Sequence, residues 1–132
     1  MRVALDIDDT ITRCPQFFSF ISKALIAAGH DVFVISYRLD HEEVEQQLKS
    51  EYDIAFNKVI LPTSEELDRE GFFGWKANAC RRLNIDIFFE DMPEVINELD
   101  PSVVAFMPYD AELGKVAYIE PPEKQTAAGS GA

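Results

Sequence analysis

Short apolar runs rich in β-branched residues recur along the chain, separated by longer amphipathic or charged segments. Runs of this length, bounded by polar residues, predict buried strands. We expect strands at Arg2–Ile7, Asp31–Ser36, Lys58–Leu61, Ile85–Phe89 and Val103–Met107, and a further edge strand at Val116–Ile119.

The segments between these runs carry apolar residues at helical spacing. Gly29 follows the first periodic segment, where glycine typically ends a helix. Asp40 is placed to N-cap a charged helix that buries Val44 and Leu48. We expect helices at residues 17–28, 41–49, 75–83 and 93–99, and a loop between the third strand and Trp75.

Strands that alternate with helices predict a mostly parallel sheet of about five strands, covered on both faces through right-handed crossovers. The predicted fold class is therefore a Rossmann-like, three-layer α/β/α domain. With 132 residues, 47% of them hydrophobic, the chain can bury one core of ordinary size. We expect one domain over residues 1–120. Residues 121–132 are rich in Pro, Gly, Ala and Ser and are expected to form a disordered tail.

The net charge of −12 disfavours nucleic acid as a partner, because such binding depends on clustered Lys and Arg. No apolar run reaches ~18 residues and no basic start precedes an apolar signal region, so we expect a cytoplasmic protein without membrane contact. Cys14 and Cys80 fit neither a disulfide framework nor a zinc site, and we expect both to be small buried hydrophobes.

A dense acidic motif, Asp6-Ile7-Asp8-Asp9-Thr10, follows the first apolar run. Desolvating such carboxylates without a counterion is costly, so they are poor core residues. At the end of a strand, Asp6 and Asp8 can both face the crevice at the carboxyl edge of the sheet, where open α/β sheets bind ligands. That arrangement suits a divalent metal and a phosphoryl group. The alternative is a solvated acidic turn, because Asp-Asp-Thr is also good turn chemistry.

Other polar residues are predicted to gather at the same edge. Ser36 ends the second strand, Glu90 and Asp91 end the fourth, and Lys76 begins the helix that leads into the fourth. Two of these features have an ordinary structural explanation: Ser36 as a strand-ending turn residue, and Glu90-Asp91 as an acidic helix start.

In order and spacing, these motifs resemble the haloacid dehalogenase-like (HAD) superfamily over residues 2 to about 95. The most specific element is Asp6-Ile7-Asp8-Asp9-Thr10 after Val-Ala-Leu; Val34-Ile35-Ser36 and Phe88-Phe89-Glu90-Asp91 follow in the expected order. The Asp-Asp-Thr and Glu-Asp-Met-Pro-Glu sequences are similar to those of the 5′(3′)-deoxyribonucleotidase-like branch.

The resemblance implies a phosphomonoester hydrolase with an aspartyl-phosphate intermediate on Asp6. Asp8 would be the general acid and base, a role that favours a raised pKa, which neighbouring carboxylates would promote. The implied cofactor is Mg²⁺, held by the Asp6 carboxylate, the Asp8 backbone carbonyl and the Asp91 carboxylate.

The resemblance also implies roles for residues around these acids. Ser36 would donate a hydrogen bond to the phosphoryl group, and Lys76 would neutralise charge on Asp6 and on that group. Lys58 competes with Lys76, but it precedes a strand instead of lying at the carboxyl edge. Glu90 would hold a metal-bound water.

Three further residues are candidates for outer-shell or substrate-binding roles. They are Thr10, Arg38 and Trp75, the last within the aromatic rim Phe72–Trp75.

Neither gap between the motifs is long enough for the cap domain that many members of the superfamily carry. An open site is therefore expected, which permits large substrates or is closed by a second subunit of a homo-oligomer. The expected substrate is a small phosphorylated molecule. The alternative function is a non-catalytic module that binds Mg²⁺ and a phosphorylated ligand, or a protein. A receiver-type signalling domain is disfavoured because Leu61-Pro62-Thr63 stands where its phosphoacceptor Asp is needed.

Overall fold

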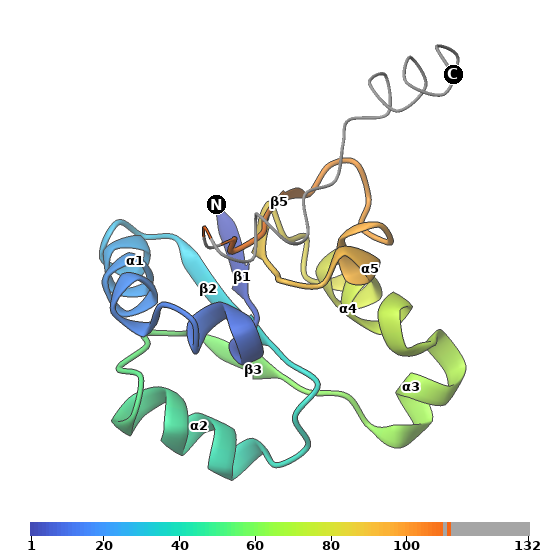
Figure 1. Cartoon of the computed structure of the whole chain (residues 1–132), viewed down its shortest axis with the longest axis horizontal. Coiled ribbons are helices and arrows are strands. Elements are labelled where there is room, and N and C mark those ends of the chain that lie inside the picture. The colour runs from blue at the N-terminus through green and yellow to red at the C-terminus, as the bar shows by residue number, and fades with distance from the viewer. Residues whose placement is uncertain (110, 112–132) are drawn as a thin grey trace.

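The computed structural model describes residues 1–109 and 111 of the chain, and the arrangement of its elements is shown in Figure 1. Within these residues five strands form one sheet, ordered β3-β2-β1-β4-β5, in which every neighbouring pair is parallel. The strands are β1 (Arg2–Leu5), β2 (Asp31–Ile35), β3 (Lys58–Ile60), β4 (Ile87–Phe89) and β5 (Val104–Phe106). The strand expected at Val116–Ile119 and the tail expected at 121–132 lie outside the described residues.

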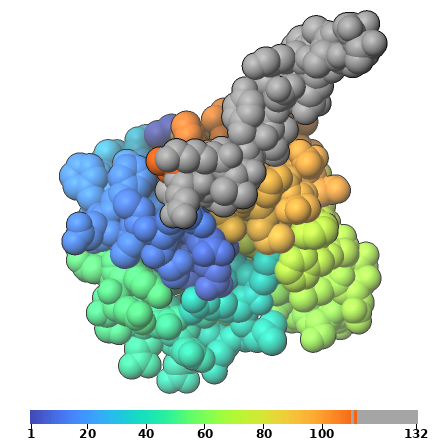
Figure 2. Space-filling model, viewed as in Figure 1, coloured from blue at the N-terminus to red at the C-terminus, as the bar shows by residue number. Residues whose placement is uncertain are grey.

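Helices connect successive strands and cover both faces of the sheet. They are η1 (Ile7–Ile11, a π-helical turn), α1 (Pro15–Ala27), α2 (His41–Ser50), α3 (Ser64–Glu70), α4 (Phe72–Arg82) and α5 (Pro93–Ile96). Figures 1 and 2 show α1 and α2 on one side of the molecule and α3 and α4 on the other. The predicted fold class, a Rossmann-like three-layer α/β domain, is confirmed.

Alternation of side chains along the strands divides the core into two clusters. Leu5 and Val34 point toward α1 and α2, where they meet Phe18 and Leu48. The intervening strand residues point the other way, into a cluster made of Ala4, Phe33, Ile35, Trp75, Ala79, Cys80, Ile85, Phe88 and Val95. Burying one large apolar side chain stabilises the fold by about 1.5–3 kcal/mol, so these two clusters attach the helices to the sheet.

The loop expected between the third strand and Trp75 is wrong, because helix α3 lies there. Thr63 accepts a hydrogen bond from the N–H of Glu66 at 3.1 Å, the usual side-chain cap at the start of a helix. Only one residue of the helix, Leu67, packs against the core, so the apolar spacing that identified the other helices is missing. Helix α4 likewise begins at Phe72, three residues earlier than expected, after Gly71 with a φ of +81°.

Smaller differences concern the ends of elements and one cysteine. α5 ends at Ile96 instead of Leu99, and the strands are each one or more residues shorter than expected. Cys80 is buried as expected, but Cys14 is exposed, because it lies between η1 and α1 instead of on a buried helix face. Among the described residues, no helix combines the length and apolar composition needed to cross a membrane.

Candidate active site

The predicted site residues meet at the carboxyl edge of the sheet because the strands that carry them are parallel. Asp6 directly follows β1, Ser36 follows β2, and Glu90 and Asp91 follow β4. Residues 6–86 are all described and contain only elements that build or cover the sheet, so no cap domain lies over this edge.

Asp6 is nearly buried, with 4% of its surface exposed, and each of its side-chain oxygens has a partner. Oδ1 accepts a hydrogen bond from Lys76 Nζ at 2.7 Å, and Oδ2 accepts one from Thr10 Oγ1 at 3.1 Å. Thr10 reaches back because the chain turns in η1, where Asp9 adopts a φ of 61°. The local turn, through Thr10, and the distant Lys76 together fix the orientation of this carboxylate.

Lys76 is 1% exposed and lies between two carboxylates. Its Nζ donates to Asp6 Oδ1 and, at 2.6 Å, to Glu90 Oε1. Lys58 lies exposed on β3, so the structure places Lys76 and not Lys58 at the candidate nucleophile. α4 brings Lys76 there from the opposite layer to Thr10, so the two partners of Asp6 approach it from different elements.

Glu90 is completely buried and is bonded through both carboxylate oxygens. Oε1 pairs with Lys76, while Oε2 accepts the backbone N–H groups of Asp91 and Met92 at 2.9 and 3.0 Å. This carboxylate therefore fixes both the lysine and the turn after β4. The sequence interpretation missed that structural role, and the expected contact of Glu90 with a metal-bound water stays a prediction.

Three carboxyl groups form a cluster that suits a divalent cation. One oxygen from each of Asp6, Glu90 and Asp91 lies within 4.8 Å of the others. Mg²⁺ prefers oxygen ligands and keeps several waters, so two carboxylates and one carbonyl from the chain are a sufficient donor set. The two predicted carboxylate ligands, Asp6 and Asp91, therefore lie close enough together to bind one cation, and Glu90 lies beside them.

Burial raises the pKa of Asp6 to about 8, because an ionised carboxylate loses its hydration there; Lys76 opposes this effect and the Glu90 carboxylate adds to it. Burial raises the pKa of Glu90 for the same reason. Two buried carboxylates thus share one ammonium group, and a bound cation would supply the positive charge that they lack.

The expectation of a raised pKa for Asp8 is wrong. Its side chain is 63% exposed and accepts two hydrogen bonds from Arg38, at 3.2 Å from Nε and 2.8 Å from the second terminal nitrogen. The Arg38 guanidinium lowers the pKa of this carboxyl, and the small burial does not offset it. Arg38 also donates to Gln47 of α2, so it is held at the rim of the site.

Ser36 lies buried at the end of β2 and forms a local turn. Its N–H donates to the carbonyl of Ile60 at 3.1 Å, and its Oγ accepts the N–H of Arg38 at 3.1 Å. The hydroxyl accepts that bond and still carries a proton that it can donate. The turn explanation and the predicted phosphoryl contact are therefore compatible.

Trp75, predicted as a possible substrate contact, is completely buried in the core and its indole N–H donates to Glu66 at 2.8 Å, so it presents no exposed surface at the site. Within the rim Phe72–Trp75, Phe72 and Phe73 keep substantial exposure, at 47% and 39%. They form the first turn of α4, so the rim is part of a helix.

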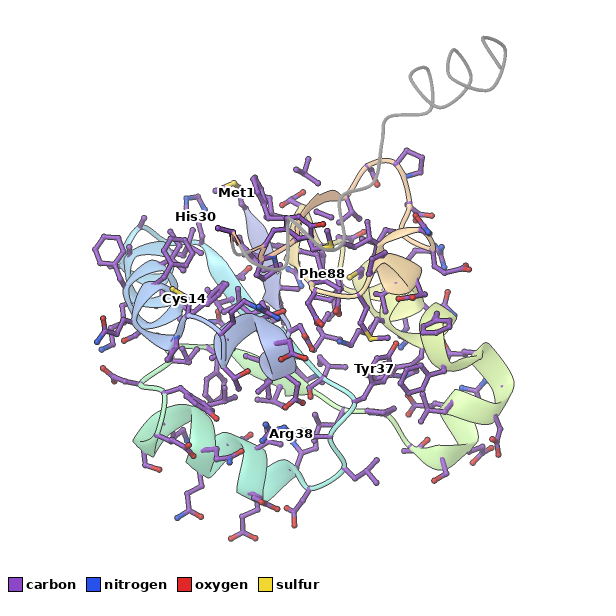
Figure 3. The ribbon with its side chains drawn as sticks, in the orientation of Figure 1. Met1, Cys14, His30, Tyr37, Arg38 and Phe88 are labelled. Atoms are coloured by element: carbon purple, nitrogen blue, oxygen red, sulfur yellow. The ribbon has the colours of Figure 1, made fainter. Side chains whose placement is uncertain are left out.

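Tyr37 is a residue of this site that the sequence interpretation missed. It and Arg38 extend to opposite sides of the chain after β2, toward α4 and α2 respectively (Figure 3). The Nζ of Lys76 lies over the Tyr37 ring, 4.5 Å from its centroid. No spacing rule identifies such a contact, and the only signal in the sequence is the position beside Ser36.

Comparison of the chain with protein-family models, with curated proteins and with solved structures finds no match.

Replacing Lys76 with Met keeps most of the side-chain volume and removes the cation from two buried carboxylates. We expect Lys76→Met to lower the free energy of unfolding by about 3–5 kcal/mol, the usual result of removing one partner of a buried ion pair. Urea unfolding at neutral pH without metal measures this loss. Adding Glu90→Gln should restore part of the stability, because one carboxylate fewer remains uncompensated. Equal stability of Lys76→Met and the parent would contradict the buried ion pair.

Proposed function

We propose that this protein is a Mg²⁺-dependent phosphomonoester hydrolase of the HAD type, acting through an aspartyl-phosphate on Asp6. The observation that carries the proposal is the buried Asp6 carboxylate, held by Lys76 and Thr10 and joined to Asp91 and Glu90 in one acidic cluster. A carboxylate that is oriented on both oxygens and paired with a cation suits attack on phosphorus.

In the first step an Asp6 oxygen forms a bond to phosphorus while the ester P–O bond breaks, and the leaving alkoxide takes a proton from Asp8. In the second step Asp8 takes a proton from water, the water oxygen attacks phosphorus, and the bond to Asp6 breaks to release inorganic phosphate. Ser36 donates to a non-bridging oxygen in both steps, and the Lys76 ammonium neutralises charge on Asp6 and on the phosphoryl group. Asp6, Asp91 and the backbone carbonyl of Asp8 would hold Mg²⁺, which would supply positive charge against the phosphoryl group.

Arg38 is a candidate substrate contact in this scheme. Its pair with Asp8 is partly solvated, so a phosphate group can compete with the Asp8 carboxylate for the guanidinium. A phosphate dianion that takes Arg38 leaves Asp8 free to carry the proton it needs. Substrate binding then prepares the acid for its role.

The same ion pair favours an alternative function. With Arg38 in place, the pKa of Asp8 is lowered, which is unfavourable for a proton donor. The alternative is a non-catalytic module that binds Mg²⁺ and a phosphorylated ligand, or a protein partner. Such a module does not need Asp8 as a proton donor, so the ion pair between Asp8 and Arg38 would stay intact. The two functions differ in turnover, which the following substitutions measure.

Asp6→Asn should abolish hydrolysis of p-nitrophenyl phosphate, because the amide cannot attack phosphorus. Asp8→Asn should lower kcat by about 10²–10⁴-fold, the usual contribution of a general acid or base. Both variants should keep the circular dichroism spectrum of the parent. In the parent, beryllium fluoride should form an adduct on the Asp6 carboxylate, detectable by ¹⁹F NMR or crystallography. Full activity of Asp6→Asn, or an adduct on another residue, would overturn the mechanism.

Mg²⁺ should raise the melting temperature of the protein, because it binds the folded acidic cluster and not the unfolded chain. Saturation at about 100 times the dissociation constant corresponds to about 2.7 kcal/mol. Asp91→Ala should remove most of this response in a thermal-shift titration. Asp68→Ala, which removes an exposed carboxylate of α3, is the matched control and should respond like the parent. A full response of Asp91→Ala would exclude Asp91 as a ligand.

The absence of a cap over residues 6–86 leaves few side chains to recognise the leaving group. A monomer should therefore hydrolyse small phosphomonoesters broadly and slowly, whereas an oligomer can complete the pocket with a second subunit. A panel of deoxynucleoside monophosphates and sugar phosphates, run with light scattering, tests this expectation. A monomer that is highly selective for one small metabolite would contradict it, and Phe72 and Phe73 would then be the residues to examine.

A further inference from the structure

An aromatic side chain lies against the buried ammonium group of the candidate site. A lysine ammonium has three N–H donors. Two of them are taken by Asp6 Oδ1 and Glu90 Oε1, at 2.7 and 2.6 Å. The Tyr37 ring covers the same nitrogen, 4.5 Å from the ring centroid, which is inside the ~6 Å range of a cation–π contact.

Tyr37 is itself fixed by the helix that carries the lysine. Its hydroxyl donates to the carbonyl of Phe72 at 2.6 Å, and its ring stacks on Phe72 with centroids 4.0 Å apart. Phe72 precedes Lys76 by four residues, one turn along the same face of α4. Tyr37 therefore contacts both the start of α4 and the ammonium that this helix delivers.

Removing the ring would open the lysine to water. Lys76 is 1% exposed, and a second ring, Phe88, lies 5.9 Å from its Nζ. Water beside Nζ would take a donor and raise the local dielectric, which weakens the attraction between Lys76 and Asp6. The lysine would then hold Asp6 less firmly.

We propose that Tyr37 is a positioning residue, whose ring shields the Lys76 ammonium from water and keeps it directed at Asp6 and Glu90. The inference rests on the proposed function for its effect on turnover, but its effect on Lys76 is independent of that function. The shielding of the Lys76 ammonium comes from the Tyr37 ring more than from its hydroxyl. Tyr37→Phe therefore keeps the shield and Tyr37→Leu removes it.

The first measurement is competitive acylation of lysines followed by mass spectrometry, with exposed Lys58 as the internal reference. The labelling of Lys76 should rise at least about tenfold in Tyr37→Leu and stay near the parent value in Tyr37→Phe. Phe56→Leu is the matched control, because Phe56 is a half-buried ring that contacts another lysine, Lys49, in the opposite layer. It should leave the labelling of Lys76 unchanged.

The second measurement is the kinetics of p-nitrophenyl phosphate hydrolysis. Tyr37→Leu should lower kcat about tenfold with little change in KM, because Lys76 acts on charge that develops in the transition state. Tyr37→Phe should restore most of kcat. If the parent is inactive, the proposed function fails while the labelling still tests Tyr37. Unchanged labelling of Lys76 in Tyr37→Leu, or an equal rise in Phe56→Leu, would overturn the inference.

Discussion

The site depends on one buried interaction, the Lys76 ammonium between the Asp6 and Glu90 carboxylates. A single buried carboxylate loses several kcal/mol of hydration, and two that lie close together also repel each other. Asp6 and Glu90 follow β1 and β4, which are neighbours in the sheet, so the parallel topology itself brings them together. The Lys76 ammonium offsets the charge of both carboxylates. For Lys76 to reach Asp6 and Glu90, α4 must pack with its N-terminal end at the carboxyl edge of the sheet.

A second ion pair, Asp8 with Arg38, differs from the first in its exposure. The Lys76 pairs are buried and therefore rigid, whereas the Arg38 pair borders solvent and can exchange partners at little cost. The segment Ser36–Arg38 contributes to both: Tyr37 covers Lys76, and Arg38 holds Asp8. The segment after β2 thus contacts both the buried ion pairs of Lys76, which are fixed, and the partly solvated pair of Asp8, which can exchange.

The sequence predicted the parts of this structure that follow from periodicity and topology. Alternating strands and helices determine a parallel sheet, and a parallel sheet places Asp6, Ser36 and Asp91 at one edge. Helix α3 was missed because it has a single apolar residue and forms mainly through its Thr63 cap. The lowered pKa of Asp8 depends on Arg38, which is 30 residues away in the chain, and no local pattern reveals such a pair. The Tyr37 contact with Lys76 joins the segment after β2 to α4, and no local pattern in the sequence reveals it.

The balance of charge at the carboxyl edge connects these features to the chemistry. When fully ionised, the carboxylates of Asp6, Asp8, Glu90 and Asp91 bring four negative charges, and Lys76 and Arg38 bring two positive ones. A phosphate dianion approaching this edge alone therefore meets net repulsion, in a chain whose overall charge is already −12. A divalent cation would neutralise the edge, and it would lower the pKa of Asp6 by replacing the hydration that burial removed. Metal and phosphate binding at this edge should consequently favour each other, because the cation removes the repulsion that the phosphate meets and the phosphate offers oxygen ligands to the cation.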